Sequence, residues 1–371
     1  MIKQRRFIFS LLLFFLISCS YKKQSGIVIK GNVKNLPASK VYLIDFSKWR
    51  GLLDSADYRN DTFSFHINPK EFHPRIVSIY FVDREGNSNV LAYKNSFLST
   101  DSTKYDETSF VLDKGTTTIS GSYIDQESTL KIVGSRQNIP LFKTALIGFG
   151  EINTTNKVRR KELIDYYKNL IKEYPYSYYF ISMIYKYRFQ YSKNELEDIL
   201  PLFDNTAGMA YFKDKFYKYF QQLPVPGLPF HNYTLMNSFG QLKNMISDSS
   251  KLNMLIFWAS WCGPCRLEIP ELKNIYTEFK NKGLHMVSIS SDKNQGAWRT
   301  LLSKEDMEWE QLIVDSSLSD EIENTFQSDE IPLIIFTNNK GIELRRFTGY
   351  APANEEEFKD FIEKYIKVKD K

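Results

Sequence analysis

The sequence predicts a multidomain protein with an N-terminal all-β sandwich, a helical connector and a C-terminal α/β domain. Three observations support this: short alternating segments up to about residue 133, helical spacing up to about residue 223, and strands alternating with helices thereafter. The roughly 350 residues after an apolar leader exceed what one hydrophobic core usually serves. We therefore divide the chain into a leader (1–18), a tether (19–25), a β region (26–135), a helical region (136–223) and a last domain (224–371).

The first eighteen residues have the layout of an export signal peptide. Basic residues at positions 3, 5 and 6 precede an apolar run, residues 7–17, that is too short to span a membrane comfortably. Leu-Ile-Ser-Cys closes the run at Cys19 and resembles the lipobox of bacterial lipoproteins. That resemblance implies that Cys19 is acylated and becomes the first residue of the mature chain. The alternative is an ordinary cleaved signal that contains a cysteine, and in both cases the protein leaves the cytoplasm.

The charge of the chain offers no argument for a nucleic-acid partner. The formal charge is +5, and the leader contributes +3 of it because it contains three basic residues and no acid. The remaining +2 is close to neutral for a chain of this length. The 23 tyrosines and 28 phenylalanines indicate packed cores and argue against disorder.

The β region consists of short segments in which apolar and polar residues alternate. Residues 27–33, 40–46, 62–67 and 75–82 have this pattern, and Gly, Asn, Asp and Pro turns separate them. Such spacing predicts an antiparallel β sandwich or barrel. No cluster of a nucleophile, an acid or metal ligands stands out in this region.

The helical region begins where the apolar spacing changes. Apolar and aromatic residues recur at helical spacing from Leu163 to Tyr174 and again after Pro175. Ser192 and Glu195 form a predicted capping box for the next helix. A further aromatic face is expected to pack in a core rather than to form a peptide-binding groove; it comprises Tyr211, Phe212, Phe216, Tyr217 and Phe220.

A proline-rich linker at residues 221–229 leads into the last domain. From residue 230 the predicted order is strand, strand, helix, strand, helix, strand, helix, strand, strand, helix. This order predicts one central sheet in an α/β arrangement. Residues 284–291, 333–336 and 343–347 are predicted strands, residues 315–326 contain a helix, and residues 355–367 form the closing amphipathic helix.

The segment Trp261-Cys262-Gly263-Pro264-Cys265 lies at the predicted turn between a strand and a helix. Pro264 suits the first helical turn, where a missing N–H costs nothing. The helix dipole and free backbone N–H groups there favour the thiolate form of Cys262. We expect Cys262 to be the nucleophile, and Cys265, one turn further along, to attack the mixed disulfide and release the substrate.

Two other interpretations of the cysteine pair are less consistent with the sequence. A structural zinc site needs four ligands, but the chain has only three cysteines and four scattered histidines. A purely structural disulfide is disfavoured because closing a two-residue loop removes little chain entropy. A redox-active disulfide therefore remains the preferred interpretation, with no metal site.

The stretch from Phe257 to Pro270 resembles the active-site segment of thioredoxin-like, membrane-anchored thiol-disulfide oxidoreductases. That group includes the enzymes that reduce apocytochromes during cytochrome c maturation. The resemblance covers about the last 145 residues and implies a C-terminal thioredoxin fold. It further implies that Pro332 is the cis-proline of that fold, whose loop pairs with a bound substrate peptide, and that Pro270 kinks the active-site helix.

The same resemblance assigns further site residues. Glu268 matches an acidic residue kept near the cysteines, where it could accept a proton from Cys265. The alternative for Glu268 is an exposed first-turn carboxylate that the helix dipole favours. The substrate-binding residues expected around the pair are Trp261, Gly263, Pro264, Ile331 and Pro332.

The chain also departs from cytoplasmic thioredoxin. Ile256 stands where thioredoxin has a buried aspartate, and Ser288 stands where its partner lysine would be. These departures favour the exported branch of the family, and residues 294–309 leave room for the extra strand and helix of that branch. The pattern across residues 31–65 resembles the small β domain that precedes thioredoxin-like domains in Bacteroidetes lipoproteins, which implies a spacer, dimerisation or docking role.

The expected activity is reduction or isomerisation of protein disulfides. Gly-Pro between the cysteines is the dipeptide of thioredoxin, whose couple lies near about −270 mV. No nicotinamide or flavin motif is present, so we expect no cofactor besides the redox disulfide. A membrane dithiol protein would then supply electrons at the periplasmic face of the cell envelope, where the lipid anchor holds the chain.

Two other functions remain open at this point. A thiol peroxidase shares the fold, but its cysteine normally follows a Thr-x-x-Cys arrangement, whereas Ser260 precedes the motif here. The other is a lipoprotein binding module in which the redox domain is auxiliary, because more than half of the mature chain shows no chemistry.

Overall fold

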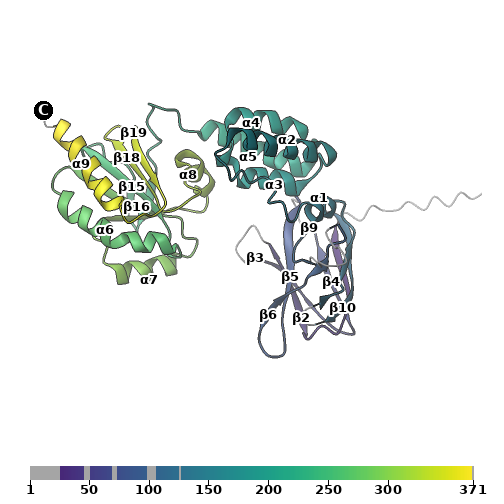
Figure 1. Cartoon of the computed structure of the whole chain (residues 1–371). Coiled ribbons are helices and arrows are strands. Elements are labelled where there is room, and N and C mark those ends of the chain that lie inside the picture. The colour runs from purple at the N-terminus through teal and green to yellow at the C-terminus, as the bar shows by residue number, and fades with distance from the viewer. Residues whose placement is uncertain (1–25, 46–50, 69–72, 98–105, 125–126, 370–371) are drawn as a thin grey trace, which may run out of the picture. The chain divides into compact units, whose positions relative to one another are not determined.

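The computed structural model describes residues 26–45, 51–68, 73–97, 106–124 and 127–369. The predicted leader and tether, with Cys19, lie outside these residues. The described residues form two compact units: the first contains those up to 151 with segments 161–184 and 203–209, and the second contains segments 152–160 and 185–202 with those from 210 to 369. Figure 1 shows the order of β region, helical region and mixed α/β domain along the chain.

Two five-stranded sheets make up most of the β region. The first has the order β11-β10-β1-β4 with β12 beside β10, and the second has the order β3-β2-β5-β6 with β9 beside β5. A short pair, β7 and β8, accompanies them. The strands are β1 (Ile27–Lys34), β2 (Lys40–Asp45), β3 (Gly51–Asp57), β4 (Thr62–Ile67), β5 (Arg75–Val82), β6 (Ser88–Val90), β7 (Tyr93–Lys94), β8 (Asp106–Glu107), β9 (Phe110–Leu112), β10 (Gly115–Ile124), β11 (Glu127–Ser128) and β12 (Lys131–Val133).

Both sheets contribute to a single core, which confirms the predicted sandwich. Ile29 of β1, Val41 of β2 and Val77 of β5 are fully buried in it. Gly31 is required in β1 because a Cβ atom there would overlap the ring of Phe63, which lies across the strand. One detail of the prediction is wrong: β1 and β10 pair in parallel, not antiparallel. The long chain between these strands permits a parallel pair, which a short hairpin cannot form.

The helical region contains five α-helices and two 3₁₀ turns among the described residues. They are α1 (Asn138–Lys143), α2 (Lys157–Glu173), α3 (Tyr178–Lys186), α4 (Lys193–Ile199) and α5 (Ala207–Gln222), with turns at Arg188–Gln190 and Leu200–Leu202. The predicted capping box is confirmed at α4: the Glu195 N–H donates to Ser192 Oγ at 3.3 Å, and the Ser192 N–H donates to Glu195 Oε2 at 2.7 Å.

The aromatic face predicted for residues 211–220 is partly wrong. Phe212, Phe216 and Tyr219 are buried, at the i, i+4 and i+7 positions of α5. Tyr217 is 63% exposed and Tyr211 also faces solvent. A helix advances about 100° per residue, so neighbours of buried positions turn away from the core, and only one stripe is buried.

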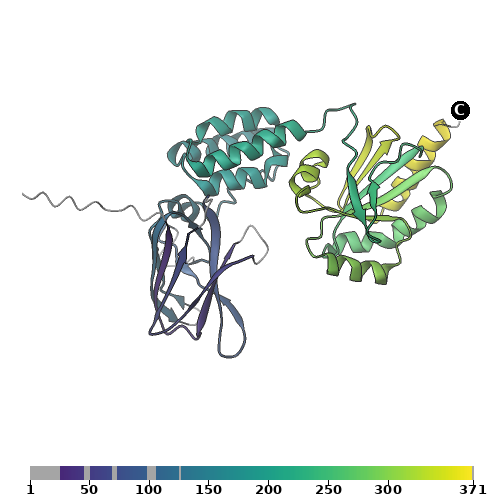
Figure 2. The same cartoon turned by 180° about the vertical axis from the view of Figure 1, so that it is seen from behind.

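A sheet forms the centre of the last domain (Figure 2). It has seven strands in the order β14-β13-β17-β16-β15-β18-β19. Three strands precede the first helix, one more than predicted, because the short edge strand β14 was missed. The strands are β13 (Thr234–Asn237), β14 (Leu242–Asn244), β15 (Leu252–Trp258), β16 (Leu284–Ser290), β17 (Glu310–Ile313), β18 (Leu333–Asn338) and β19 (Glu343–Thr348), and the helices are α6 (Gly263–Phe279), α7 (Gln295–Glu305), α8 (Ser319–Phe326) and α9 (Asn354–Lys369).

Strand β15 is buried along its whole length and separates two cores. Its residues Met254 and Ile256 pack with side chains of α6 and α9 on one face of the sheet. Leu255 and Phe257 pack with Phe326 of α8 on the other face. Burial on both faces explains why this strand is a continuous apolar run.

Within the residues described, none of the helices combines the length and apolar character needed to cross a membrane.

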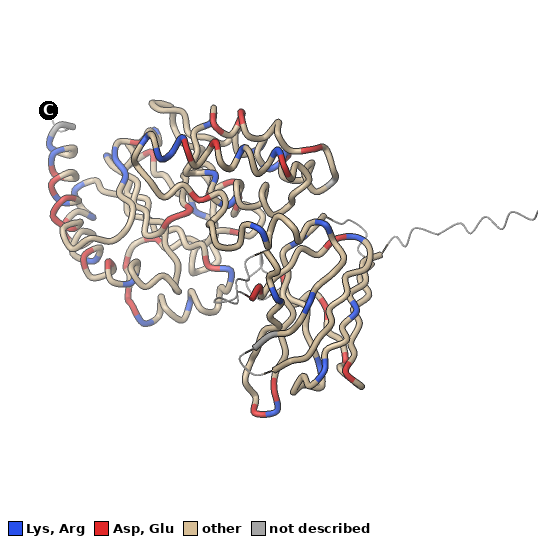
Figure 3. Tube along the Cα trace, turned by 45° about the vertical axis from the view of Figure 1, so that its right-hand side comes forward, with Lys and Arg blue, Asp and Glu red and all other residues tan. Residues whose placement is uncertain are grey.

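Basic and acidic residues alternate with one another along the described chain, with neither kind confined to one region (Figure 3).

Part of the helical region is hydrogen-bonded to α8 within the second compact unit. Arg188 Nη2 donates to Glu323 Oε1 at 2.7 Å, and Lys215 Nζ lies 2.7 Å from Asp320 Oδ2. Asn324 Nδ2 also donates to Gln222 Oε1 at 2.8 Å. Helix α8 is therefore held by both the sheet and the helical region.

Candidate active site

Cys262 and Cys265 form a disulfide at the start of α6, with their Cα atoms 5.3 Å apart. Strand β15 ends at Trp258, and Cys262 is the N-cap residue of the helix. The backbone N–H of Cys265 points to Cys262 Sγ at 3.2 Å. Exposure is 5% for Cys262 and 3% for Cys265, whereas the neighbouring Trp261 is 71% exposed. The disulfide is thus set just below the surface, beside a large exposed aromatic ring.

The loop before β18 lies against the disulfide. The Ile331–Pro332 peptide bond is cis, as the resemblance implied. The carbonyl oxygen of Ile331 lies 3.8 Å from Cys262 Sγ. Among the described residues, Ile331 forms no hydrogen bond to another main-chain group. Its N–H and C=O are therefore available to an extended peptide chain that approaches Cys262.

Glu268 lies on α6 and is only 1% exposed. Its Oε1 accepts a hydrogen bond from Asn354 Nδ2 at 3.1 Å, while Oε2 has no partner among the described residues. Burial raises the pKa of Glu268 to about 7; the Asn354 hydrogen bond opposes this shift and the negative charge of Glu271 adds to it. The alternative of an exposed carboxylate is wrong, because α9 packs against α6 and covers this side chain.

The raised pKa of Glu268 makes the stability of the domain depend on pH. A carboxyl with a pKa of about 7 in the folded state and about 4.3 in the unfolded state binds its proton more tightly when folded. Its stabilising effect is therefore complete below pH 4 and is lost as pH rises toward 7. Only the parent loses this contribution as pH rises, so we expect the stability of Glu268→Gln relative to the parent to increase by about 2 kcal/mol from pH 5 to pH 8. Urea unfolding of the disulfide form at the two pH values measures this change.

The matched control is Glu356→Gln, since Glu356 is exposed on α9. We expect its stability difference from the parent to be the same at both pH values. A pH-independent difference for Glu268→Gln would contradict the assignment of a protonated, buried Glu268.

Several residues that support this site were not identified from sequence. Asp292 is buried and anchors the turn before the motif: Ser260 donates to it from its backbone N–H at 2.8 Å and from Oγ at 2.7 Å. Ser290 Oγ donates to the same carboxylate at 2.7 Å. Asn354, the partner of Glu268, was also missed. Ser290 is only two positions from Asp292, but Ser260 lies 32 positions from Asp292 and Glu268 lies 86 positions from Asn354, so no local pattern indicates the long-range contacts.

The positions that hold charges in cytoplasmic thioredoxin are uncharged here. Ile256 and Ser288 are opposite each other in the β15–β16 pair, and both are buried. Ser288 Oγ accepts a hydrogen bond from Trp309 Nε1 at 2.8 Å. This hydrogen bond gives the buried hydroxyl a partner. The buried acids near the motif are instead Glu268 on α6 and Asp292.

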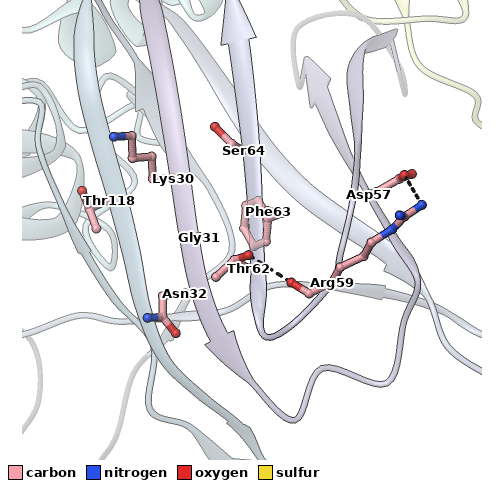
Figure 4. Close-up of a pocket in the computed structure, with 9 residues that line it drawn as sticks. All are labelled: Lys30, Gly31, Asn32, Asp57, Arg59, Thr62, Phe63, Ser64 and Thr118. Carbon is pink, nitrogen blue, oxygen red and sulfur yellow. Dashed lines mark hydrogen bonds and ion pairs between the residues drawn. The ribbon is translucent and has the colours of Figure 1, made fainter.

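A separate hollow of about 580 Å³ lies on the first sheet of the β region (Figure 4). Lys30, Ser64 and Thr118 on three neighbouring strands line it. Arg59 and Asp57 form an exposed ion pair of 3.0 Å at one side. None of its nine lining residues is a cysteine or a histidine, so the hollow offers no redox chemistry.

Across the described residues, no three His, Cys, Asp or Glu side chains are grouped so that they could hold a metal ion.

Two family models match the chain. Residues 249–342 match a thioredoxin-like family, and residues 27–139 match a domain of unknown function, DUF4369. The first match contains both cysteines and Pro332, and the second covers nearly all of the β sandwich. Both the predicted C-terminal fold and its resemblance to thioredoxin-like proteins are therefore confirmed.

Curated relatives include the thiol-disulfide oxidoreductase ResA of two bacteria. The protein of Oceanobacillus iheyensis is 49% identical over 39 residues, which are 10% of this chain and 20% of the relative. The protein of Bacillus cereus is 22% identical over 169 residues, which are 46% of this chain and 91% of the relative. The matched segment thus spans a fifth of one relative and most of the other.

Similar solved structures include two from Bacteroides. One is a thiol-disulfide oxidoreductase from Bacteroides fragilis, with 28% identity and a TM-score of 0.32 over 36% of this chain and 98% of that chain. The other is the thioredoxin domain of a thiol-disulfide oxidoreductase from Bacteroides vulgatus, with 20% identity and a TM-score of 0.35 over 38% of this chain and 99% of that chain.

Proposed function

Because the C-terminal part of this chain is a thioredoxin-like domain with thiol-disulfide oxidoreductase relatives, we propose that it reduces or isomerises protein disulfides outside the cytoplasm. Cys262 and Cys265 are the redox couple, and apocytochromes c are candidate substrates. The observation that supports this most strongly is the Cys262–Cys265 disulfide at a helix N-terminus, beside the cis Ile331–Pro332 loop.

The reduced couple performs two thiol-disulfide exchanges. The Cys262 thiolate attacks one sulfur of the substrate disulfide, which breaks the S–S bond and releases the first substrate thiolate. The Cys265 thiolate then attacks Cys262 Sγ and releases the second substrate thiolate. In total the enzyme loses two electrons and two protons, and the substrate gains them. The N-terminus of α6 stabilises the Cys262 thiolate through its backbone N–H groups.

Glu268 is the group that we assign to the proton of Cys265. With a pKa of about 7, this carboxyl is partly ionised near neutral pH and can both accept and return a proton. Asn354 holds one carboxyl oxygen, and the other oxygen has no protein partner among the described residues. Trp261, Gly263, Pro264, Ile331 and Pro332 form the surface that contacts the substrate.

The electrons come from another dithiol protein in the membrane, because we expect no cofactor in this chain besides its own disulfide. The N-terminal segment supports a location at the periplasmic face of the cell envelope, with a lipid on Cys19 as the anchor. Acylation would remove Cys19 from disulfide chemistry and leave Cys262 and Cys265 as the free pair.

The reduction potential of the Cys262–Cys265 couple is the test of direction. We expect a value near about −270 mV in a dithiothreitol or glutathione titration of the purified chain, as for other Gly-Pro dithiols. A value above about −180 mV would assign oxidation rather than reduction. Hydrogen peroxide consumption by the reduced chain at a rate exceeding its disulfide reduction would instead favour a peroxidase.

A further inference from the structure

A cavity of about 180 Å³ opens beside the disulfide, on the face of the sheet that α8 covers. Trp261 and Ile331, the residues just before Cys262 and Pro332, both line it. If a substrate polypeptide binds along the Ile331 backbone, the residues that flank its reacting cysteine lie beside this cavity. The cavity is therefore positioned to contact a substrate side chain next to that cysteine.

Part of the cavity wall is apolar, although Ser291, Ser319 and Ser328 also line the cavity. Phe257 of β15, Ile289 of β16 and Ile322 of α8 contribute to the apolar part, and each is nearly fully buried. Trp258 lines it as well, and its indole N–H has no hydrogen-bond partner among the described residues. Such a wall favours an aliphatic chain over a fully polar one.

The charged side chains that line the cavity are both acidic, Glu323 and Asp329. Arg188, which is 4% exposed, neutralises Glu323 through the 2.7 Å bond and also donates to Asn324 Oδ1 at 2.9 Å. Asp329 is an exposed residue, and it is not held by an ion pair among the described residues. Desolvation of its carboxyl beside the cavity nevertheless raises its pKa; the charges of Glu330 and Glu323 add to that shift, while the charge of Arg188 opposes it. An added positive charge at this position would relieve the repulsion.

We infer that this cavity binds a lysine or arginine side chain next to the substrate cysteine, and that the enzyme prefers disulfides flanked by basic residues. The apolar wall takes the aliphatic stem of such a side chain, while its charged end reaches the Asp329 carboxylate. The exposed ring of Trp261 offers a cation–π contact at the entrance. This inference rests on the proposed function, since it names the substrate class of the same site.

The test uses the full chain, purified in detergent, and disulfide-bonded peptides that differ only in the residue next to one cysteine: arginine, glutamine or glutamate. We expect kcat/KM of the parent to be about five-fold higher for the arginine peptide than for the glutamate peptide, the effect of one partly exposed charge pair. Asp329→Lys should reverse this ratio, and Asp329→Asn should bring it close to one.

The matched control is Glu330→Gln, which removes an exposed neighbouring carboxylate that does not line the cavity. Its arginine-to-glutamate ratio should stay near the parent value. The ratio is taken within each variant, so it does not depend on the fraction of folded enzyme. Equal rates on the three peptides, or an unchanged ratio in Asp329→Lys, would overturn the inference. Failure to reduce any of the peptides would instead contradict the proposed function.

Discussion

Replacing Cys262 by alanine is expected to abolish disulfide reduction, whereas replacing Cys265 by alanine is expected to trap the substrate. Cys262 lies at the helix N-terminus beside the Ile331 carbonyl, so it is the sulfur that an incoming disulfide meets. Without Cys265, nothing attacks the mixed disulfide, and it accumulates on Cys262. Insulin reduction measures the first effect, and affinity capture of Cys265→Ala from cells followed by mass spectrometry measures the second.

Two controls separate the roles of the cysteines. Cys262→Ala should capture no substrate, and Cys19→Ser in the Cys265→Ala background should still capture it, since Cys19 is not part of the couple. Substrates recovered on Cys265 in the Cys262→Ala variant, and none on Cys262, would reverse the assigned roles. The captured proteins would also show whether apocytochromes c are among the substrates.

Arg188→Ala is expected to cost about 3 kcal/mol of stability, the largest loss that we predict outside the disulfide. The guanidinium is buried, donates to Glu323 and Asn324, and stacks 4.1 Å from the ring centroid of Phe189. Its removal leaves the Glu323 carboxylate without its counter-charge and opens a gap against the aromatic ring. Urea unfolding of the oxidised chain measures the loss.

The matched control for Arg188 is Arg59→Ala. Arg59 pairs with Asp57 at 3.0 Å, but both side chains are more than half exposed, so water screens the pair. We expect that variant to lose less than about 1 kcal/mol. Similar losses for both variants would show that burial of the Arg188 ion pair adds nothing. Apolar packing alone would then hold helix α8 in position.

The stability of α8 bears directly on the site. This helix contributes Ile322 and Glu323 to the cavity beside the disulfide, and its residues Glu323 and Asn324 are the partners of Arg188. The helical region, which has no redox chemistry of its own, thereby supports the wall of the cavity through Arg188. We expect Arg188→Ala to alter the peptide preference as well as the stability.

The sequence alone determined the local features of this protein. Alternating residues predicted strands β1, β2, β4 and β5 of the sandwich, and a capping box predicted the start of α4. The motif from Trp261 to Cys265 predicts redox chemistry by itself, because a reversible dithiol/disulfide couple requires only two neighbouring thiols and the backbone N–H groups at a helix start. Each of these signals lies within about ten residues of chain, so it can be read without the fold.

Only the tertiary structure decided which side chains surround the motif. Glu268 is buried because α9 covers it, and Asn354 supplies its hydrogen bond from 86 residues away. Asp329 faces the disulfide cavity through the path of the loop before Pro332, and Arg188 reaches Glu323 across 135 residues. The physical reason is that burial and side-chain pairing depend on which elements pack together. The sequence of one helix or strand does not specify which other elements pack against it.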